Sequence, residues 1–528
     1  MTSMPFKPTA EYWQALAVTS HDIEFLQNHL FEVETPLSSR QLLAVLIAER
    51  IRVEKDAEAA QRKKSGALYL PKETYAKGQK LVFPALGFLA GQVVATRPGS
   101  NPQLGAFDVI EVALEDGSSR SFASTLSAHR LNDPLEEQAD PESEPDAILA
   151  EHGEQLEQKL WSALSADGNI AQVAGFWFPR ALLMEINPGH LNLAEAVVEM
   201  AGGEPMSASS LMEQIDLPRD ANTELAEFSL NYALQEDGRF DEVGPAGQVL
   251  WCLRRLEPEE VQHVPLFLQY KPIEHDRSLL SEQMLVLETQ LDDELSETGQ
   301  KPTKADEATL TLTYPHWRAG TLPVSARMRL LFPTANFAPR IRFTLVDAKT
   351  GERIQAWVVR EHKYVYGLRD WYEKQKLIPG AYITIRRSAI PGEVLVEAKT
   401  RRPAREWVRT VLAGSDGGLV FALLKQEVAC EYNERMAAVI PDVDAVDKSF
   451  AQTSKNNQSL ERLIRDMLRE LSKLTPQGHV HVEELYSAVN ILRRVPPAPL
   501  FATLAATSDF VHIGDLHFRL GEAAAEEN

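Results

Sequence analysis

The chain has 528 residues, which is too long for one hydrophobic core and favours roughly three to five domains. Its 44% hydrophobic and 25% charged residues are typical of a folded protein, and two cysteines, Cys252 and Cys430, are too few for a disulfide framework or a zinc cluster. The net charge of −22 excludes a general attraction to nucleic acid, so any such binding must be local.

The sequence shows no pattern of a membrane or secreted protein. The first residues lack a basic region followed by an apolar run, and the longest apolar stretch, 81–95, is interrupted by proline and glycine. We therefore expect no membrane segment and no membrane partner. The scarcity of cysteine fits a reducing compartment, so we predict a cytoplasmic protein.

The order of elements predicts a multi-domain α+β protein. Residues 1–64 are expected to form an N-terminal helical segment of two helices, the second beginning near Ser38 after the break at Pro36. Short apolar runs separated by turn residues in 65–132 predict a small β-barrel, and their pattern resembles the SH3-like type. Residues 133–160 are acidic and contain three prolines, which predicts an extended acidic linker.

Residues 161–270 are predicted to form a helical module with a terminal hairpin. A helix and a Gly-Gly-Glu-Pro turn precede SSLMEQI. The segment TELAEFSLNYALQEDGRFDEVG then supplies a third helix and a turn at Asp237-Gly238, and two short strands end in VLWCLRRL. On these residues, the segment 183–256 resembles the winged-helix modules of the HARE-HTH family, which implies a chromatin or transcription protein. The third helix carries Glu224 and Glu227 but no Lys or Arg before Arg239, so we expect it to bind protein or to be architectural.

Strand-like alternation returns after a second predicted acidic linker, 271–307. We expect strands from residue 308 to 333, a hairpin at 347–351, a short helix, and two strands around Ser388 to Gly392. On the phrase GLRDWYEKQKLIPGAYITIRR, the segment 308–450 resembles B3-like DNA-binding pseudobarrels. The resemblance implies DNA contact through strands and loops.

The central β-domain is also the one strongly basic part of the chain. Residues 317–410 include 19 Lys or Arg and 8 Asp or Glu, a local net charge of +11. Aromatic residues are interleaved with these cations, as on surfaces that bind phosphates and stack on bases. We predict that this face binds DNA, most simply as a double strand. The candidate contacts are Arg386, Arg387, Lys399, Arg401, Arg402, Arg405 and Arg409, framed by Trp371 and Trp407.

The C-terminal part repeats the earlier helical pattern. Asp442, Asp444 and Asp447 predict a short acidic connector. Residues 451–528 are expected to form a second winged helix, and the segment 458–520 resembles the HARE-HTH modules more weakly than 183–256 does. Its third helix is apolar, which leaves Arg493 and Arg494 as its candidate phosphate contacts.

No phosphate-binding loop, dinucleotide fingerprint, nucleophile elbow or zinc-protease motif is present, so we assign no catalytic residue, metal or cofactor. We predict a non-enzymatic, multi-module DNA-associated regulator of transcription or chromatin, with RNA polymerase or other proteins as partners. Two alternatives remain open. One is a scaffold that docks an acidic protein, and the other is a Mg²⁺-dependent nuclease built on Glu397-Ala398-Lys399 with Asp370 as its second carboxylate.

Overall fold

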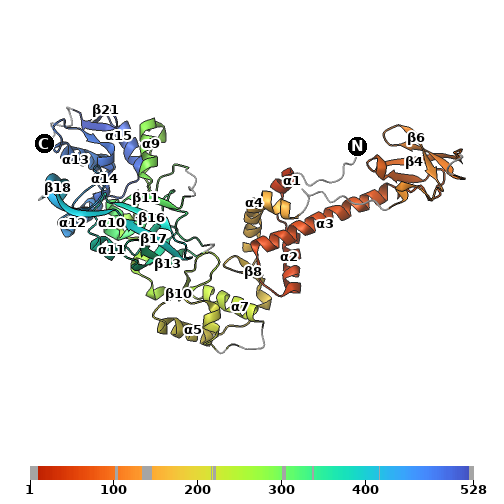
Figure 1. The fold of residues 1–528 in the computed structure, drawn as a ribbon, viewed down its shortest axis with the longest axis horizontal. Coiled ribbons are helices and arrows are strands. Elements are labelled where there is room, and N and C mark those ends of the chain that lie inside the picture. Colours follow the sequence, from red (N-terminus) through yellow and green to blue (C-terminus); the bar gives the residue numbers. More distant parts are fainter. Residues whose placement is uncertain are drawn as a thin grey trace. The chain divides into compact units, whose positions relative to one another are not determined.

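The chain forms two compact units, each described here by itself (Figure 1). The structure, a computed structural model, describes residues 10–101, 105–133, 145–215, 217, 222–299, 305–335, 338–414 and 417–521. The first unit comprises residues 1–185 and 220–232, and the second comprises 186–219 and 233–528. Both contain helices and sheets, which confirms the α+β class; the boundaries of the seven predicted segments stay a prediction. Among the described helices, none has the length and apolar character needed to cross a bilayer.

The two predicted N-terminal helices are present. The side chain of Thr19 caps α2 (Ser20–Val33) and that of Ser38 caps α3 (Ser39–Ser65), each within a reciprocal capping box. These helices pack with α1 (Ala10–Ala15) around a core that includes Leu26, Leu30, Leu42 and Leu46.

Residues 145–165 form helix α4 (Pro145–Ser165), so the prediction of an extended linker is wrong for this part of 133–160. Residues 134–144 of that linker lie outside the described residues. The helix forms because its apolar side chains share one face, and burial of this face outweighs the acidic composition. The buried side chains are Ile148, Leu149, Leu156, Leu160 and Leu164.

A five-stranded sheet lies between α3 and α4 in the sequence. Its strands follow chain order, and the ends of the sheet meet: Tyr69 Oη donates to the Ala123 carbonyl at 2.6 Å and Ser124 Oγ donates to the Glu73 carbonyl at 2.8 Å. The predicted β-region is therefore present, and its SH3-like character stays a prediction. The strands are β2 (Ala67–Leu68), β3 (Lys80–Phe83), β4 (Leu89–Pro98), β5 (Asp108–Leu114) and β6 (Ser119–Ser124).

One order of elements occurs three times along the chain: a helix, a short strand or bridge, two helices, and a β-hairpin. In each copy the second strand of the hairpin is the central one. It pairs on one side with the first strand of the hairpin and on the other side with the short strand or bridge that precedes the second helix. The N-terminal copy was not predicted, because the five-stranded sheet separates its second and third helices. It consists of α2, β1 (Leu37–Ser38), α3, α4, β7 (Ile170–Val173) and β8 (Phe176–Pro179).

The two predicted copies have the expected elements. In the middle copy, residues 223–232 of the third helix belong to the first unit and the rest of the copy to the second. The middle copy consists of α5 (Pro188–Met200), a bridge from Met206 to Trp251, α6 (Ala208–Met212), α7 (Thr223–Glu236), β9 (Phe240–Glu242) and β10 (Trp251–Leu253). The C-terminal copy consists of α13 (Leu460–Ser472), β20 (Val480–His481), α14 (Val482–Leu492), α15 (Pro497–Ala506), β21 (Phe510–Gly514) and β22 (His517–Leu520).

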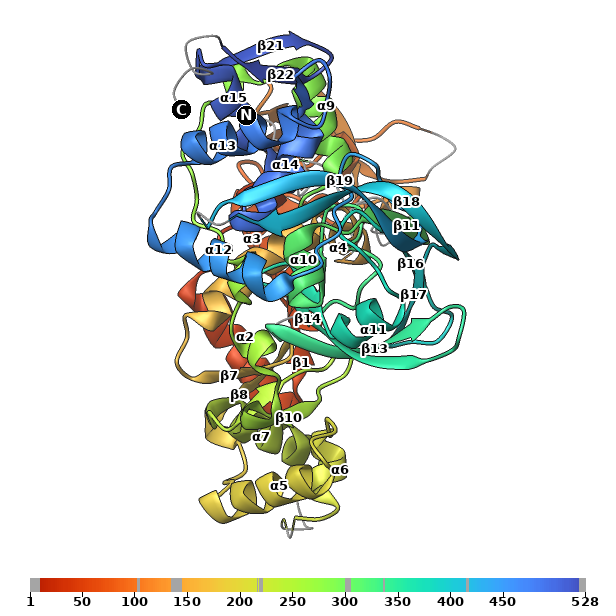
Figure 2. The same ribbon diagram turned by 90° about the vertical axis from the view of Figure 1, so that its left-hand side faces the viewer.

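The centre of the second unit is a seven-stranded, curled half-barrel with the strand order β11-β16-β17-β13-β14-β15-β12 (Figure 2). Helix α10 (Tyr314–Ala319) interrupts the segment 308–333 that we predicted as strands; Pro315 lies in its first turn, and Gly320 ends it at φ +68. The predicted short helix is α11 (Arg369–Lys374). The strands are β11 (Glu307–Thr311), β12 (Thr321–Pro323), β13 (Arg340–Asp347), β14 (Arg353–Val359), β15 (Tyr364–Tyr366), β16 (Tyr382–Arg387) and β17 (Glu393–Ala398).

A separate two-stranded ribbon, β18 (Thr400–Ala413) and β19 (Leu419–Cys430), follows the half-barrel. On the ribbon, Val408 and Val428 pack into the core of the half-barrel, whereas Val411 and Phe421 pack into the core of the C-terminal helices. The ribbon therefore joins two cores.

Two predicted acidic connectors are also folded. Within 271–307, Ser281 caps α9 (Glu282–Leu291), which buries Met284 and Leu287. Asp442 caps α12 (Val443–Lys455), where the sequence predicted a linker. Both corrections have the same cause, since apolar residues at helical spacing find a core to pack against.

A buried ion cluster lies just beyond α9. The Arg494 guanidinium donates to Asp293 at 2.6 Å and to Glu294 at 2.8 Å, Tyr486 Oη donates to Asp293 at 2.5 Å, and His316 Nε2 lies 3.2 Å from Glu294. Burial alone would raise the pKa of Glu294, but Arg494 and then His316 hold that pKa below its usual value. The prediction that Arg494 contacts a phosphate is wrong, because its side chain is 2% exposed.

We expect Arg494→Ala to lower the free energy of unfolding of the second unit by about 3–5 kcal/mol, because two carboxylates would stay buried without their cation. Differential scanning calorimetry would detect this as a lower transition temperature. Arg493→Ala is the control, since within the described part of the chain that half-buried guanidinium donates to the Gln458 carbonyl and has no ion pair. Equal shifts in both variants would contradict the structural role assigned to the cluster.

Candidate nucleic-acid interface and pocket

The third helices of the three repeated copies offer no basic face. Helix α15 has no charged residue and is buried over most of its length, and α7 carries only acidic charges. In α4 the one cation is Lys159, whose Nζ donates to the carbonyls of Gln14 and Leu16 at 2.6 and 3.0 Å. A helix that reads DNA needs donors toward phosphates and base edges, so these three helices are poor candidates.

Three predicted contact arginines are compensated by acidic neighbours. Arg386 pairs with Glu397 at 2.7 Å, and Arg401 pairs with Glu406 at 2.5 Å. Arg387 lies 3.7 Å from Asp306 and also donates to the Leu330 carbonyl. These side chains remain partly exposed, but their charge is largely balanced.

Two further predicted contacts are interior side chains. Arg409 is 7% exposed and donates to the carbonyls of Arg435 and Ala437, while Trp371 is 3% exposed and donates its indole N–H to Asp347 at 2.7 Å. The expectation that these two residues face a nucleic acid is therefore corrected. Arg409 fastens β18 to the following loop, and Trp371 holds α11 to the β13 hairpin.

The remaining predicted contacts lie on or next to the ribbon. Trp407 is 65% exposed, and the register of the ribbon places Lys425 directly opposite it, with the ammonium 5.4 Å from the centre of its ring. Arg405 lies two residues before Trp407 and hence on the same face. Arg402 and Arg405 are exposed, and no ion pair or hydrogen bond of either side chain occurs among the described residues.

We call Arg402, Arg405, Trp407 and Lys425 the ribbon patch. Lys399 lies just before the ribbon, with its ammonium 5.8 Å from the centre of the Tyr382 ring. Sequence reasoning missed Lys425, because only the strand register brings it opposite Trp407. Hydrophobic side chains are exposed on the same ribbon: Leu412, Val420, Leu423 and Leu424.

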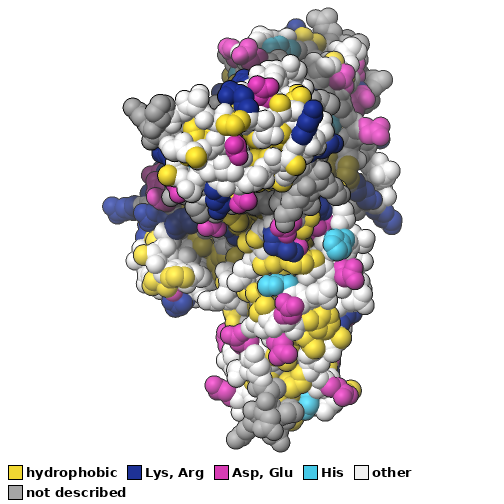
Figure 3. All heavy atoms as spheres, turned by 90° about the vertical axis from the view of Figure 1, so that its right-hand side faces the viewer, with side chains coloured by type: hydrophobic (Ala, Val, Ile, Leu, Met, Phe, Trp, Pro, Cys, Tyr) yellow, Lys and Arg dark blue, Asp and Glu magenta, His cyan; other side chains and the backbone are white. Residues whose placement is uncertain are grey.

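On the face drawn in Figure 3, basic, acidic and hydrophobic side chains are interspersed. Glu397, the acid of the Glu-x-Lys triplet, is engaged by Arg386, and within the described ranges no group of three or more His, Cys, Asp or Glu residues is placed to hold a metal ion.

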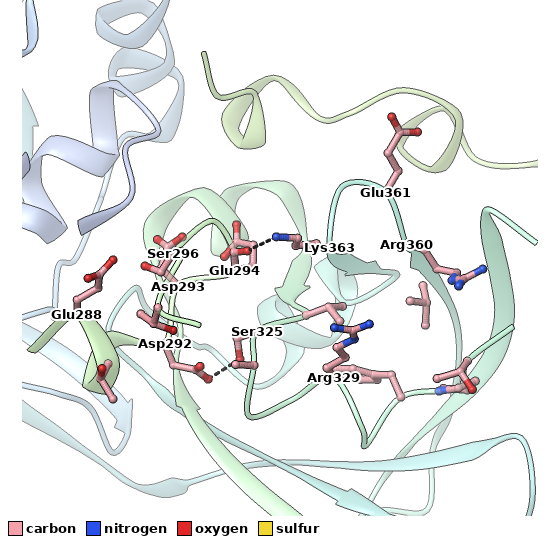
Figure 4. Close-up of a pocket in the computed structure, with 18 residues that line it drawn as sticks. Glu288, Asp292, Asp293, Glu294, Ser296, Ser325, Arg329, Arg360, Glu361 and Lys363 are labelled. Carbon is pink, nitrogen blue, oxygen red and sulfur yellow. Dashed lines mark hydrogen bonds between the residues drawn. The ribbon is translucent and has the colours of Figure 1, made fainter. Parts of the chain in front are cut away.

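The second unit also contains a cavity of about 480 Å³, drawn in Figure 4. One side is formed by the end of α9 and the residues after it, including Glu288, Asp292 and Glu294. The opposite side carries Arg329 and Arg360. Its volume falls in the range of pockets that hold small molecules.

Comparison of the chain with known protein families, curated proteins and solved structures found no match in any of the three. The ribbon patch and the pocket therefore have to be interpreted from their own geometry and charge.

A buried carboxyl pair elsewhere in the second unit has a structural role. Glu257 and Asp241 both contact Arg340, with 3.4 Å between Glu257 Oε2 and the guanidinium. Burial, followed by the charge of Asp241, raises the pKa of Glu257 to about 8. One cation thus contacts two carboxyl groups. The charges balance when Glu257 keeps its proton and only Asp241 is ionised.

We expect Glu257→Gln to flatten the fall in stability of the second unit as pH rises from about 4.5 to about 8. In that window the folded wild-type protein retains the Glu257 proton, whereas the unfolded chain releases it. The contribution of Glu257 to the free energy of unfolding is therefore complete at low pH and decreases as the pH rises. The neutral amide has no proton to lose. Unfolding temperatures measured across this pH range would test the prediction, and Glu259→Gln, at an exposed position, is the control. Parallel profiles for wild type and Glu257→Gln would contradict the raised pKa of Glu257.

Proposed function

We propose that this protein is a non-enzymatic DNA-binding protein that contacts the phosphate backbone through the ribbon patch. The observation that carries the proposal is the set of exposed cations on the ribbon, Arg402, Arg405 and Lys425, together with the exposed ring of Trp407. None of the three has an ion pair among the described residues, although the register places the exposed Glu427 opposite Arg405. Cations of this kind release counterions from DNA when they bind, and two-stranded ribbons are established elements for contacting its grooves.

The acidity of the remaining chain restricts where DNA can bind. With a net charge of −22, most of the surface repels a polyanion, so contact is favoured only where cations are both exposed and uncompensated. The half-barrel, which we propose to be a B3-like pseudobarrel, supports the patch from below through Val408 and Val428.

The three repeated copies are proposed to be winged-helix modules, and the five-stranded sheet of the first unit an SH3-like barrel. Because their third helices lack an available cation, we assign these modules to protein contacts, such as those with RNA polymerase, or to architecture. This arrangement fits a cytoplasmic regulator of transcription or chromatin.

A protein partner at the ribbon is the second candidate, and one observation favours it. Leu412, Val420, Leu423 and Leu424 are exposed on the same ribbon, and exposed apolar side chains near cations also suit an acidic protein. The first candidate requires that the chain bind duplex DNA and the second does not, so a measurement of DNA binding distinguishes them.

We expect the double variant Arg402→Gln/Arg405→Gln to weaken binding to a duplex DNA and to make the plot of log K against log salt less steep by about 2. The reason is that each phosphate contact contributes about 0.9 to this slope. Fluorescence anisotropy with a labelled duplex at several salt concentrations measures both quantities.

The matched control is Lys77→Gln/Lys80→Gln, which removes the same charge from exposed positions in the first unit. It should leave both the affinity and the slope close to wild type. Loss of affinity to the same degree in both double variants would indicate a net-charge effect, and absence of duplex binding by the wild-type chain would favour the acidic protein partner.

A further inference from the structure

The cavity of about 480 Å³ in the second unit is lined by many acidic residues, but most of their charge is already compensated. Glu288 pairs with Arg277 at 2.7 Å, and Asp292 pairs with Arg327 at 3.0 Å and accepts a hydrogen bond from Ser325. Asp293 and Glu294 share Arg494 in the buried ion cluster. The four carboxylates of the acidic wall thus share three arginines, which leaves one negative charge on this side.

The basic side of the same cavity is not compensated. Arg329 is exposed, and no ion pair or hydrogen bond of its side chain occurs among the described residues. Arg360 donates to the Ala338 carbonyl at 2.9 Å and Lys363 donates to the Glu294 carbonyl at 3.1 Å, so both keep their full positive charge. Against these three cations stands one lining carboxylate for which the described residues supply no ion pair, that of Glu361.

The backbone holds these cations at the rim. Arg360 directly follows β14 and Lys363 directly precedes β15, so the tight turn between two paired strands fixes their separation. The Val324 amide donates to the Lys363 carbonyl at 2.7 Å, which ties the turn to the segment that leads to Arg329. Phe332, Pro333 and Val358 give the cavity apolar lining beside the charged groups.

We propose that this cavity binds a small anionic molecule, whose phosphate or carboxylate groups are held by Arg329 and Arg360, with Lys363 adding positive charge on the side of Glu294 (Figure 4). The apolar part of the ligand lies against Phe332 and Val358. Arginine is suited to this role because its planar fork binds two oxygens of an oxyanion at once. The site is separate from the ribbon patch and does not depend on the function proposed for it.

The test uses the full chain and three probes measured by isothermal titration calorimetry. Adenosine triphosphate and citrate carry phosphate and carboxylate groups respectively, and adenosine is the uncharged counterpart of the first. We expect at least one anionic probe to bind with a dissociation constant below about 1 mM, and adenosine to bind at least about tenfold more weakly than adenosine triphosphate. Preference between the two anions identifies the ligand group.

Variants of exposed residues then locate the site. Arg329→Gln/Arg360→Gln should weaken binding of the anion at least about tenfold, because two charge-assisted hydrogen bonds are lost. Glu361→Gln should strengthen it about two- to fivefold, because it removes an opposing charge. The variant Lys77→Gln/Lys80→Gln removes the same charge from exposed positions in the first unit and should leave anion binding unchanged.

Three results would overturn the proposal. The first is no heat of binding for either anion up to about 10 mM. The second is equal weakening by the pocket double variant and by Lys77→Gln/Lys80→Gln, which would indicate binding to net charge. The third is an affinity that the pocket variants leave unchanged. Failure of DNA binding at the ribbon has no bearing on these outcomes, so the two proposals can fail separately.

Discussion

The second unit depends on one buried ion cluster, in which Arg494 neutralises Asp293 and Glu294. Its members come from three places in the chain: the segment after α9, helix α10 with His316, and helix α14 with Tyr486 followed by Arg494 just beyond that helix. Taking these charges out of water is costly, and the cost is offset only when all partners are in place. The cluster therefore specifies one arrangement of the half-barrel and the C-terminal helices, and it explains why a segment as acidic as 271–307 folds inside this unit.

The same pairing decides which charges face solvent. Much of the acid near the half-barrel is bound to arginine, as in the pairs of Arg386 with Glu397 and Arg401 with Glu406. Composition is therefore a poor guide to local potential, because a pair of opposite charges contributes little at a distance. Among the described residues near the half-barrel, exposed cations without an ion pair gather in two places, the ribbon patch and the rim of the pocket. An otherwise acidic surface increases the selectivity of both places for anions with a defined shape.

The threefold repetition of one element order shows how the chain combines a common scaffold with different surfaces. The N-terminal copy accepts an entire five-stranded sheet between α3 and α4, and the C-terminal copy buries its third helix α15 against the rest of its unit. An insertion of this kind is tolerated because the ends of the inserted sheet meet, through Tyr69 and Ala123. Neither copy keeps a basic third helix, so the scaffold alone does not determine what each copy binds.

The sequence by itself determined the local elements: the capped starts of α2 and α3, the hairpin at 347–351, and the helix–helix–hairpin order of two copies, since caps, turns and apolar periodicity are short-range signals. Tertiary structure alone decided that the acidic stretches holding α4, α9 and α12 are folded, because their apolar faces needed partners distant in sequence. It also decided which cations are free. Arg402 and Arg409 belong to the same basic stretch of the sequence, yet Arg402 is exposed and Arg409 is buried. Strand register and long-range packing set the neighbours of each side chain, and no local sequence pattern encodes them.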